Sequence, residues 1–129
     1  MIAIVCRSVR LGGPGSQWGI VVDTLTLDDF KKMELRTARV MDVQEIPGAD
    51  RLWRLLIDVG NEKKEIVAGI KQHYARESLL GQTVVVVNNL VPSVIRGVES
   101  KGMLLAARSD TQFSLLMLDK DLPPGSPIG

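Results

Sequence analysis

Hydrophobic positions along the chain form short runs separated by glycine, proline, asparagine or charged residues. The clearest pattern covers residues 52–59, where every odd position from Trp53 to Val59 is apolar, as expected for a strand with one buried face. A β-branched run over residues 83–87 is typical of a buried strand. Together the runs predict strands over residues 35–46, 52–59, 65–68, 83–87, 103–107 and 113–118.

The first of these strands changes the phase of its alternation near Arg39. A phase change inside one strand indicates a β-bulge, which small barrels use to bend a strand between two parts of a sheet. The segment over residues 123–127 is rich in proline and glycine and is expected to end regular structure.

Two segments favour helix. Residues 70–80 are predicted to be helical, as one helix or two short pieces, with Gly81 ending them. Residues 25–33 are predicted to form a short helical turn with Thr26 as its N-cap. Phe30 is expected to plug one end of the core.

Five strands with a helix between the third and the fourth match the order of the OB-fold, a five-stranded Greek-key barrel. We therefore expect an all-β domain with minor helix, its barrel over residues 34–107, followed by a C-terminal extension strand. Trp53 should be buried with the residues predicted to form the core: Leu35, Val40, Leu55, Ile57, Val67, Val85, Val87, Leu104 and Ala106.

A polar connection over residues 89–103 lies between the last two barrel strands. Pro92 removes a backbone donor, and Gly97 and Gly102 mark tight turns or close approaches. Polar loops on a rigid scaffold often carry binding residues, although such a connection can also be merely solvated. Its polar side chains are Asn89, Ser93, Arg96, Ser100 and Lys101.

Length and composition are those of one ordinary globular domain. The chain has 129 residues, 45% of them hydrophobic and 24% charged, and its net charge of +1 gives no indication of a general polyanion binder. Cys6 is the only cysteine, so no internal disulfide forms and a reducing compartment is expected. Arg7 and Arg10 follow the apolar N-terminus instead of preceding it, which argues against a signal peptide. No apolar run is long enough for a membrane helix, and we expect a cytoplasmic protein.

Residues 1–24 are expected to form an N-terminal arm, with a possible strand over residues 2–11, and residues 25–129 the domain proper. Nothing in the chain favours catalysis. His73 is the only histidine, so neither a catalytic triad nor a structural zinc site can be assembled from recognisable ligands. We expect His73 to be a helix-borne surface or groove residue beside Tyr74. The sequence therefore predicts no enzyme, no metal and no cofactor.

Binding of nucleic acid depends on where the positive charges gather. The chain has 16 basic and 15 acidic residues; since Arg7, Arg10 and Asp23 precede residue 25, the domain proper holds 14 of each and is neutral. Arg96, Lys101 and Arg108 form a local basic group opposed by Glu99. Further positive charge on the same face is expected from Arg36, Arg39 and Arg54 if the first two strands turn them outward; otherwise the arginines are scattered solubilising charges.

Aromatic residues make up only 4% of the chain, which argues against a row of stacked single-stranded bases. Tyr74 is expected to be the exposed ring. Few aromatic platforms with a small basic patch favour recognition of folded RNA by backbone and shape.

The same connection also carries a motif. It contains Asn-Leu-x-Pro at residues 89–92 and Ile-Arg-Gly-Val-x-Ser-x-Gly-Met-Leu-Leu-Ala at residues 95–106. With it come Asp28-Asp29-Phe30, Glu34-Leu35-Arg36, Pro47-x-Ala49-Asp50-x-Leu52, Asp58-x-Gly60 and the run over residues 66–70. This set resembles the structure-specific tRNA-binding domain, an OB module fused to many methionyl-tRNA synthetases and also found free-standing as a dimer. The resemblance covers residues 25–129.

The resemblance implies a non-catalytic module that grips the body of tRNA without reading its sequence, with an aminoacyl-tRNA synthetase as a possible partner. It places Arg96 and Lys101 on phosphates, Ser100 as a hydrogen-bond donor, Met103 as an apolar contact and Asn89 at the edge of the groove. Family members commonly have Lys or Arg at the positions of Val91, Ser93 and Val94, so this chain departs from the pattern at those positions.

Two rival functions stay open. A related secretion-chaperone branch of the fold binds peptides, and Val91, Val94 and Ile95 would line an apolar groove equally well. A purely structural dimerisation appendage is the third possibility. The apolar positions of residues 113–118 exceed what one strand buries, which, with the resemblance, predicts a homodimer in which this C-terminal segment covers its partner.

Overall fold

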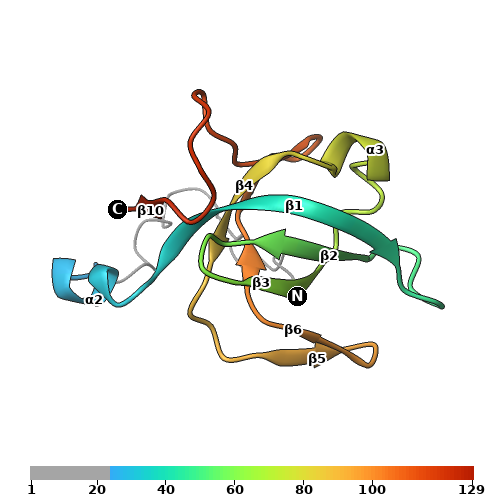
Figure 1. Ribbon diagram of the computed structural model, residues 1–129, viewed down its shortest axis with the longest axis horizontal. Helices are drawn as coiled ribbons and strands as arrows, with labels where there is room; N and C mark the ends of the chain where they lie inside the picture. The colour runs from blue at the N-terminus through green and yellow to red at the C-terminus, as the bar shows by residue number, and fades with distance from the viewer. Residues whose placement is uncertain (1–23) are drawn as a thin grey trace.

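The computed structural model describes residues 24–129, and the remainder of the expected N-terminal arm, with its possible strand over residues 2–11, lies outside this range (Figure 1). The architecture is a curled antiparallel sheet with the order β3-β2-β1-β4-β7, an OB-like half-barrel, as predicted. Its strands are β1 (Leu35–Glu45), β2 (Trp53–Asp58), β3 (Lys63–Ala68), β4 (Thr83–Val87) and β7 (Met103–Leu104).

The central strand β1 bends at a bulge. Its first half pairs with β4, from Leu35 opposite Val87 to Arg39 opposite Thr83, and its second half pairs with β2. The β2 register shifts at Met41, which has no partner between Val40 and Asp42. The predicted bulge near Arg39 is therefore confirmed, and it lets one strand serve both sides of the curled sheet.

The N-terminal helical turn is α2 (Leu27–Lys31), and the Thr26 hydroxyl accepts the Asp29 N–H at 3.0 Å as the predicted N-cap. The role assigned to Phe30 is wrong, because α2 has no buried residue and Phe30 is exposed. Leucine and phenylalanine side chains on so short a helix need a second surface to cover them, and the barrel lies beyond its reach (Figure 1).

A polar network joins β1, β3 and the residue after β4 near α2. Glu34 accepts a hydrogen bond from Arg36 Nε at 2.8 Å, and Lys64 Nζ donates to Asn88 Oδ1 at 2.8 Å. Asn88 Nδ2 lies 3.5 Å from Glu34 Oε2. The hydrogen bond from Arg36 holds the pKa of Glu34 below its ordinary value.

The predicted helix over residues 70–80 is wrong in extent. The chain forms a turn at residues 71–73 and only one short helix, α3 (Arg76–Leu79). Tyr74 interrupts the helix because its backbone and its side chain both bond to distant residues. Its carbonyl accepts Trp53 Nε1–H at 2.8 Å, and its hydroxyl accepts the Leu115 N–H at 2.9 Å. Tyr74 is consequently half-buried and not the exposed ring that was expected, and His73 lies in the turn and not on a helix.

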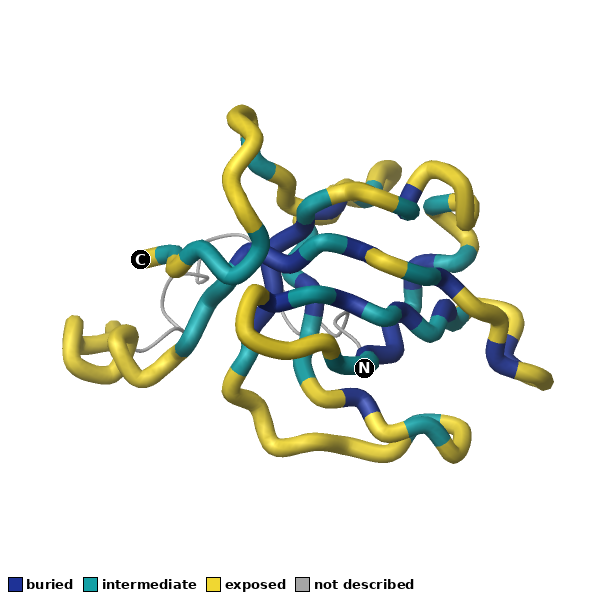
Figure 2. The backbone as a smooth tube through the Cα atoms, viewed as in Figure 1, coloured by how far each residue is buried: buried dark blue, intermediate teal, exposed yellow. Residues whose placement is uncertain are grey.

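The hydrophobic interior consists of one principal cluster and one satellite. The principal cluster is formed mainly by residues of the sheet strands, many of them dark blue in Figure 2, and includes Trp53, as predicted. The satellite is built from Ile46, Ala49 and Val67. Seven of the predicted core residues are buried, namely Val40, Leu55, Ile57, Val67, Val85, Val87 and Leu104, whereas Leu35 and Ala106 are half-buried at the ends of their strands.

The C-terminal part differs from its prediction in two ways. The expected strand over residues 103–107 divides into β7 and β8 (Ala106–Arg108), and β8 forms a hairpin with β9 (Phe113–Leu115). The expected strand over residues 113–118 ends at Leu115, with only a bridge from Met117 to Val84 beyond it. Residues 123–127 do not end regular structure, because β10 (Pro127–Ile128) pairs with β1.

The segment before β10 packs closely against the β2–β3 turn. Gly125 donates its N–H to Thr37 O at 2.8 Å, and Thr37 Oγ1 donates to Pro123 O at 2.9 Å. A Cβ added to Gly125 would lie 2.5 Å from Val59 O and 2.9 Å from Gly60 Cα. This side of the barrel therefore depends on two glycine backbones in direct contact. Within residues 24–129, no helix is long and apolar enough to cross a membrane.

Candidate nucleic-acid interface

The signature connection folds into a hairpin that sequence analysis did not predict. β5 (Ser93–Ile95) and β6 (Val98–Ser100) pair with Val94 opposite Glu99. Its two-residue turn has positive φ at both Arg96 (53°) and Gly97 (80°), the geometry of the type I′ turn that matches strand twist. The pair Arg96-Gly97 between the apolar Ile95 and Val98 was the available signal, but arginine is an unusual first residue for this turn.

The hairpin lies on the satellite cluster. Ile95 and Val98 pack against it, together with Leu52 from the loop before β2. Lys101, the residue after β6, adds a backbone hydrogen bond: its N–H donates to Glu65 O of β3 at 3.0 Å. The hairpin is thus held by the outer side of β3, at the edge of the sheet (Figure 1).

Ser100 fastens this arrangement. Its hydroxyl accepts the Val67 N–H at 2.9 Å and donates to Gly102 O at 3.2 Å, and the residue is only 3% exposed. A hydroxyl with both functions occupied and no exposure cannot donate to an RNA. The structure therefore assigns Ser100 to holding the hairpin, in contrast to the expected contact.

Asn89 has a comparable position at the base of the connection. Its side-chain oxygen accepts the Glu34 N–H at 2.9 Å and its amide donates to Lys32 O at 2.7 Å. Asn89 is exposed, but its polar groups are engaged with the residues that lead into β1. It fixes where the connection leaves β4.

The three arginines of the first two strands do not form one free basic face. Each has a carboxylate partner: Arg36 with Glu34 at 2.8 Å, Arg39 with Asp121 at 3.6 Å and Arg54 with Glu65 at 2.8 Å. Arg39 lies opposite Asp58 and Arg54 opposite Gln44 on the outer side of the sheet, whereas Arg36 lies opposite the buried Val86 on the other side. Their charge is largely compensated within the domain.

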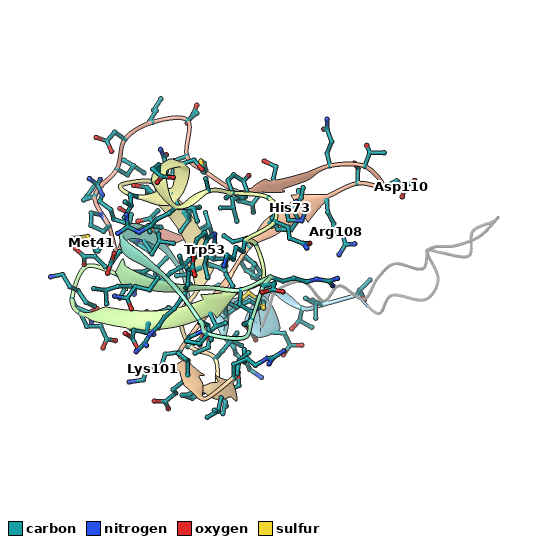
Figure 3. The ribbon with its side chains drawn as sticks, turned by 90° about the vertical axis from the view of Figure 1, so that its right-hand side faces the viewer. Met41, Trp53, His73, Lys101, Arg108 and Asp110 are labelled. Carbon is teal, nitrogen blue, oxygen red and sulfur yellow. The ribbon has the colours of Figure 1, made fainter. Side chains whose placement is uncertain are left out.

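Arg96 and Lys101 differ from those arginines. Arg96 projects from the tip of the hairpin and makes no hydrogen bond or ion pair with any residue from 24 to 129. Lys101 Nζ is 3.9 Å from Glu99 Oε1, a loose pair with both side chains about half exposed, and Figure 3 shows Lys101 at the surface. Met103 is half-buried on β7. The hairpin therefore presents two available cations, opposed by one acid.

Sequence reasoning missed Arg51 in the loop before β2. Arg51 is exposed, and the neighbouring Ala49 and Leu52 belong to the cluster that carries Ile95 and Val98. The loops that follow the first and fourth strands are the ligand loops of OB-folds. That position in the fold was the signal that could have identified Arg51.

Two valines, one before β5 and one on it, are exposed near the charged residues of the hairpin. Val91 is 88% exposed and Val94 is 72% exposed. β5 pairs with β6 alone among the strands between residues 24 and 129, so its other edge is open. An open edge with exposed valines suits strand addition by an extended peptide as well as contact with RNA.

Comparisons with known proteins agree on one family. The family model described as “Putative tRNA binding domain” matches residues 35–127. The methionine–tRNA ligase of Thermotoga maritima is 46% identical over 106 residues, which are 82% of this chain and 17% of the ligase. The ligase of Methanococcus aeolicus is 46% identical over 110 residues, 85% of this chain and 16% of the ligase. The chain thus spans about a sixth of the length of these relatives.

Two solved structures resemble the whole domain. The MetRS related protein from Pyrococcus horikoshii has a TM-score of 0.79 and 30% identity, covering 84% of this chain and 100% of that one. The chaperone CsaA from Bacillus anthracis str. Ames has a TM-score of 0.75 and 30% identity, covering 83% of this chain and 100% of that one. With the family match over most of its length, this chain belongs to the tRNA-binding domain family.

Proposed function

We propose that the chain binds tRNA without catalysing a reaction, by contacts to its backbone and shape, as a free-standing or synthetase-associated cofactor in the cytoplasm. The observation that supports this most directly is the anchored hairpin that presents Arg96 and Lys101 to solvent. Arg96 and Lys101 contact phosphates, and Met103 offers a soft apolar surface to a sugar or base face. Asn89 and Ser100 hold the hairpin in place.

Affinity in this scheme is modest and salt-dependent. Binding by phosphate neutralisation weakens with salt in proportion to the number of contacts. The carboxylates beside Arg36, Arg39 and Arg54 compete with phosphate for those side chains. Two contacts correspond to a slope of about −2 in log affinity against log salt.

Replacing the hairpin cations tests the proposal. We expect Arg96→Ala and Lys101→Ala each to weaken tRNA binding about threefold to tenfold and to reduce the salt slope by about 1. Binding is measured by fluorescence anisotropy with labelled tRNA, a hairpin RNA and an unfolded peptide, at low and moderate salt. Lys120→Ala is the matched control, because Lys120 is an exposed cation that borders a different hollow, beside Arg39 and Gly81.

The outcomes separate the candidate functions. Preference for tRNA over the hairpin RNA supports shape recognition, and equal affinity for both removes it. The exposed Val91 and Val94 favour the peptide-binding alternative, which predicts that the peptide binds and both RNAs do not. A dimer that binds none of the three ligands would leave the structural appendage as the function.

We also propose that the chain is a homodimer. Leu116 and Met117 remain exposed after β9 ends, and α2 presents Leu27 and Phe30 to solvent. These surfaces are the most suitable for a second copy, because covering them removes apolar area from water. We expect light scattering at micromolar concentration to give twice the 14.1 kDa chain mass. Leu116→Glu with Met117→Glu should shift the mass toward the monomer, and a monomeric parent protein would contradict the proposal.

A further inference from the structure

A second polar surface lies away from the β5–β6 hairpin. The turn at residues 71–73 and the β8–β9 hairpin enclose a hollow of about 210 Å³ (Figure 3). This is smaller than the roughly 300–1,000 Å³ of a site that encloses a whole small molecule, so it suits one part of a larger ligand. Its walls are Gly69, His73, Arg108, Phe113 and the loop over residues 109–112.

An aromatic platform forms one wall of the hollow. The His73 ring stacks on Phe113 with centroids 4.4 Å apart and planes 13° from parallel. Tyr74 meets Phe113 edge-on at 6.4 Å and packs against the principal core. Phe113 therefore fixes the plane of the imidazole, and His73 itself remains exposed to the hollow.

The charges around the platform match a nucleotide better than a free anion. Arg108 is exposed, and its guanidinium has no hydrogen bond or ion pair within the part of the chain that the structure describes. Asp110 borders the same hollow and would repel a phosphate placed between them. A base on His73 can donate an amino N–H to Asp110 while its phosphate lies on the outer side, toward Arg108. Figure 3 shows these two side chains on the projecting β8–β9 hairpin.

The loop that carries these groups is fixed in shape. Ser109 Oγ accepts the N–H groups of Thr111 and Gln112 at 3.3 and 3.1 Å, and Ser109 N–H donates to Gln112 O at 2.9 Å. Because the loop is already ordered, binding of a ligand here costs little conformational entropy in the loop.

The hollow is also connected to the proposed interface. Lys71 donates its N–H to Arg51 O at 3.2 Å, so the turn before His73 lies against the loop that holds Arg51. That loop in turn packs beneath Ile95 and Val98 through Ala49 and Leu52. Three exposed arginines, Arg96, Arg51 and Arg108, consequently lie along adjoining segments.

We infer that this hollow is a stacking subsite for one unpaired nucleotide of the bound RNA, with its base on His73 and its phosphate on Arg108. The inference rests on the proposed binding of tRNA and gives it a second point of attachment. It also reconciles a low aromatic content with base contact, because one stacked base needs a single platform.

His73 makes the test direct, because the only histidine of the chain gives ring proton signals that need no further assignment. In NMR spectra of the full chain we expect a single-stranded tetraribonucleotide to move these signals upfield. A blunt RNA duplex and inorganic phosphate should leave them in place. His73→Ala should weaken tRNA binding about fivefold to tenfold, whereas His73→Phe should stay within about twofold because it keeps the platform. Thermal denaturation of both variants checks that they fold.

Failure of the subsite is distinguishable from failure of the proposed function. Unmoved His73 signals at saturating tRNA, with binding still weakened by Arg96→Ala, would overturn the subsite and leave the function standing. His73 signals that move with the tetraribonucleotide, in a protein that does not bind tRNA, would support the subsite and overturn the function. Loss of affinity in His73→Phe equal to that in His73→Ala would also overturn the stacking, since an aromatic ring at this position would then not be sufficient.

Discussion

Gly125→Ala is expected to lower the free energy of unfolding by about 3 kcal/mol. Gly125 has φ near +87°, a conformation that costs an alanine strain, and the new Cβ would lie 2.5 Å from Val59 O. Val59 O and Gly60 Cα, the two atoms nearest to the new Cβ, are backbone atoms and cannot turn aside as a flexible side chain could. The β2–β3 turn or the C-terminal segment must therefore move. The movement would break the hydrogen bond from Gly125 N–H to Thr37 O. Urea denaturation followed by circular dichroism measures the change.

Gly48→Ala separates strain from contact. Gly48 has nearly the same φ, +80°, but a Cβ there meets nothing within 4 Å. Its expected cost is about 1 kcal/mol, from backbone conformation alone. Equal losses in the two variants would show that the contact between Gly125 and Gly60 adds nothing to stability.

Ser100→Val is expected to cost about 2–3 kcal/mol and to weaken tRNA binding as a consequence. Valine has no hydroxyl and adds a methyl group, so it leaves the Val67 N–H and the Gly102 carbonyl without the partner that they share now. Since the bond to Val67 joins the hairpin to β3, we expect the hairpin to lose order when it is removed. Chemical denaturation gives the stability, and hydrogen exchange at Val67 reports the local opening.

Ser93→Val is the matched control, because Ser93 lies directly opposite Ser100 in the hairpin and is exposed. We expect its stability to change by less than about 0.5 kcal/mol. If Ser100→Val weakened tRNA binding with stability unchanged, the serine would be a direct contact and its assignment as an anchor would be wrong.

The barrel could be predicted because its signals are local. The alternation from Trp53 to Val59 and the phase change near Arg39 each reflect which side of a strand is buried. The short α3 and the added β10 could not be predicted in this way. Both depend on contacts between distant residues, those of Tyr74 with Trp53 and Leu115, and those of Thr37 with the C-terminal segment.

The candidate site was predictable in position but only partly in role. The motif located the connection that carries Arg96 and Lys101, but it did not predict that this connection folds into a hairpin. It could not distinguish them from Arg39 and Arg54, whose carboxylates Asp121 and Glu65 come from elsewhere in the chain. The burial of Ser100 likewise depends on a packing partner in another strand, which no spacing in its own segment indicates.

The satellite cluster makes the hairpin a replaceable part of the molecule. Because Ile95 and Val98 pack on Val67 outside the principal core, the outward positions 91, 94, 96 and 99 can be exchanged without repacking the barrel. Substitution of those positions is therefore expected to change the free energy of unfolding little. The ligand that the hairpin binds can therefore change during evolution, from a polyanion to an extended apolar peptide, while the barrel stays the same.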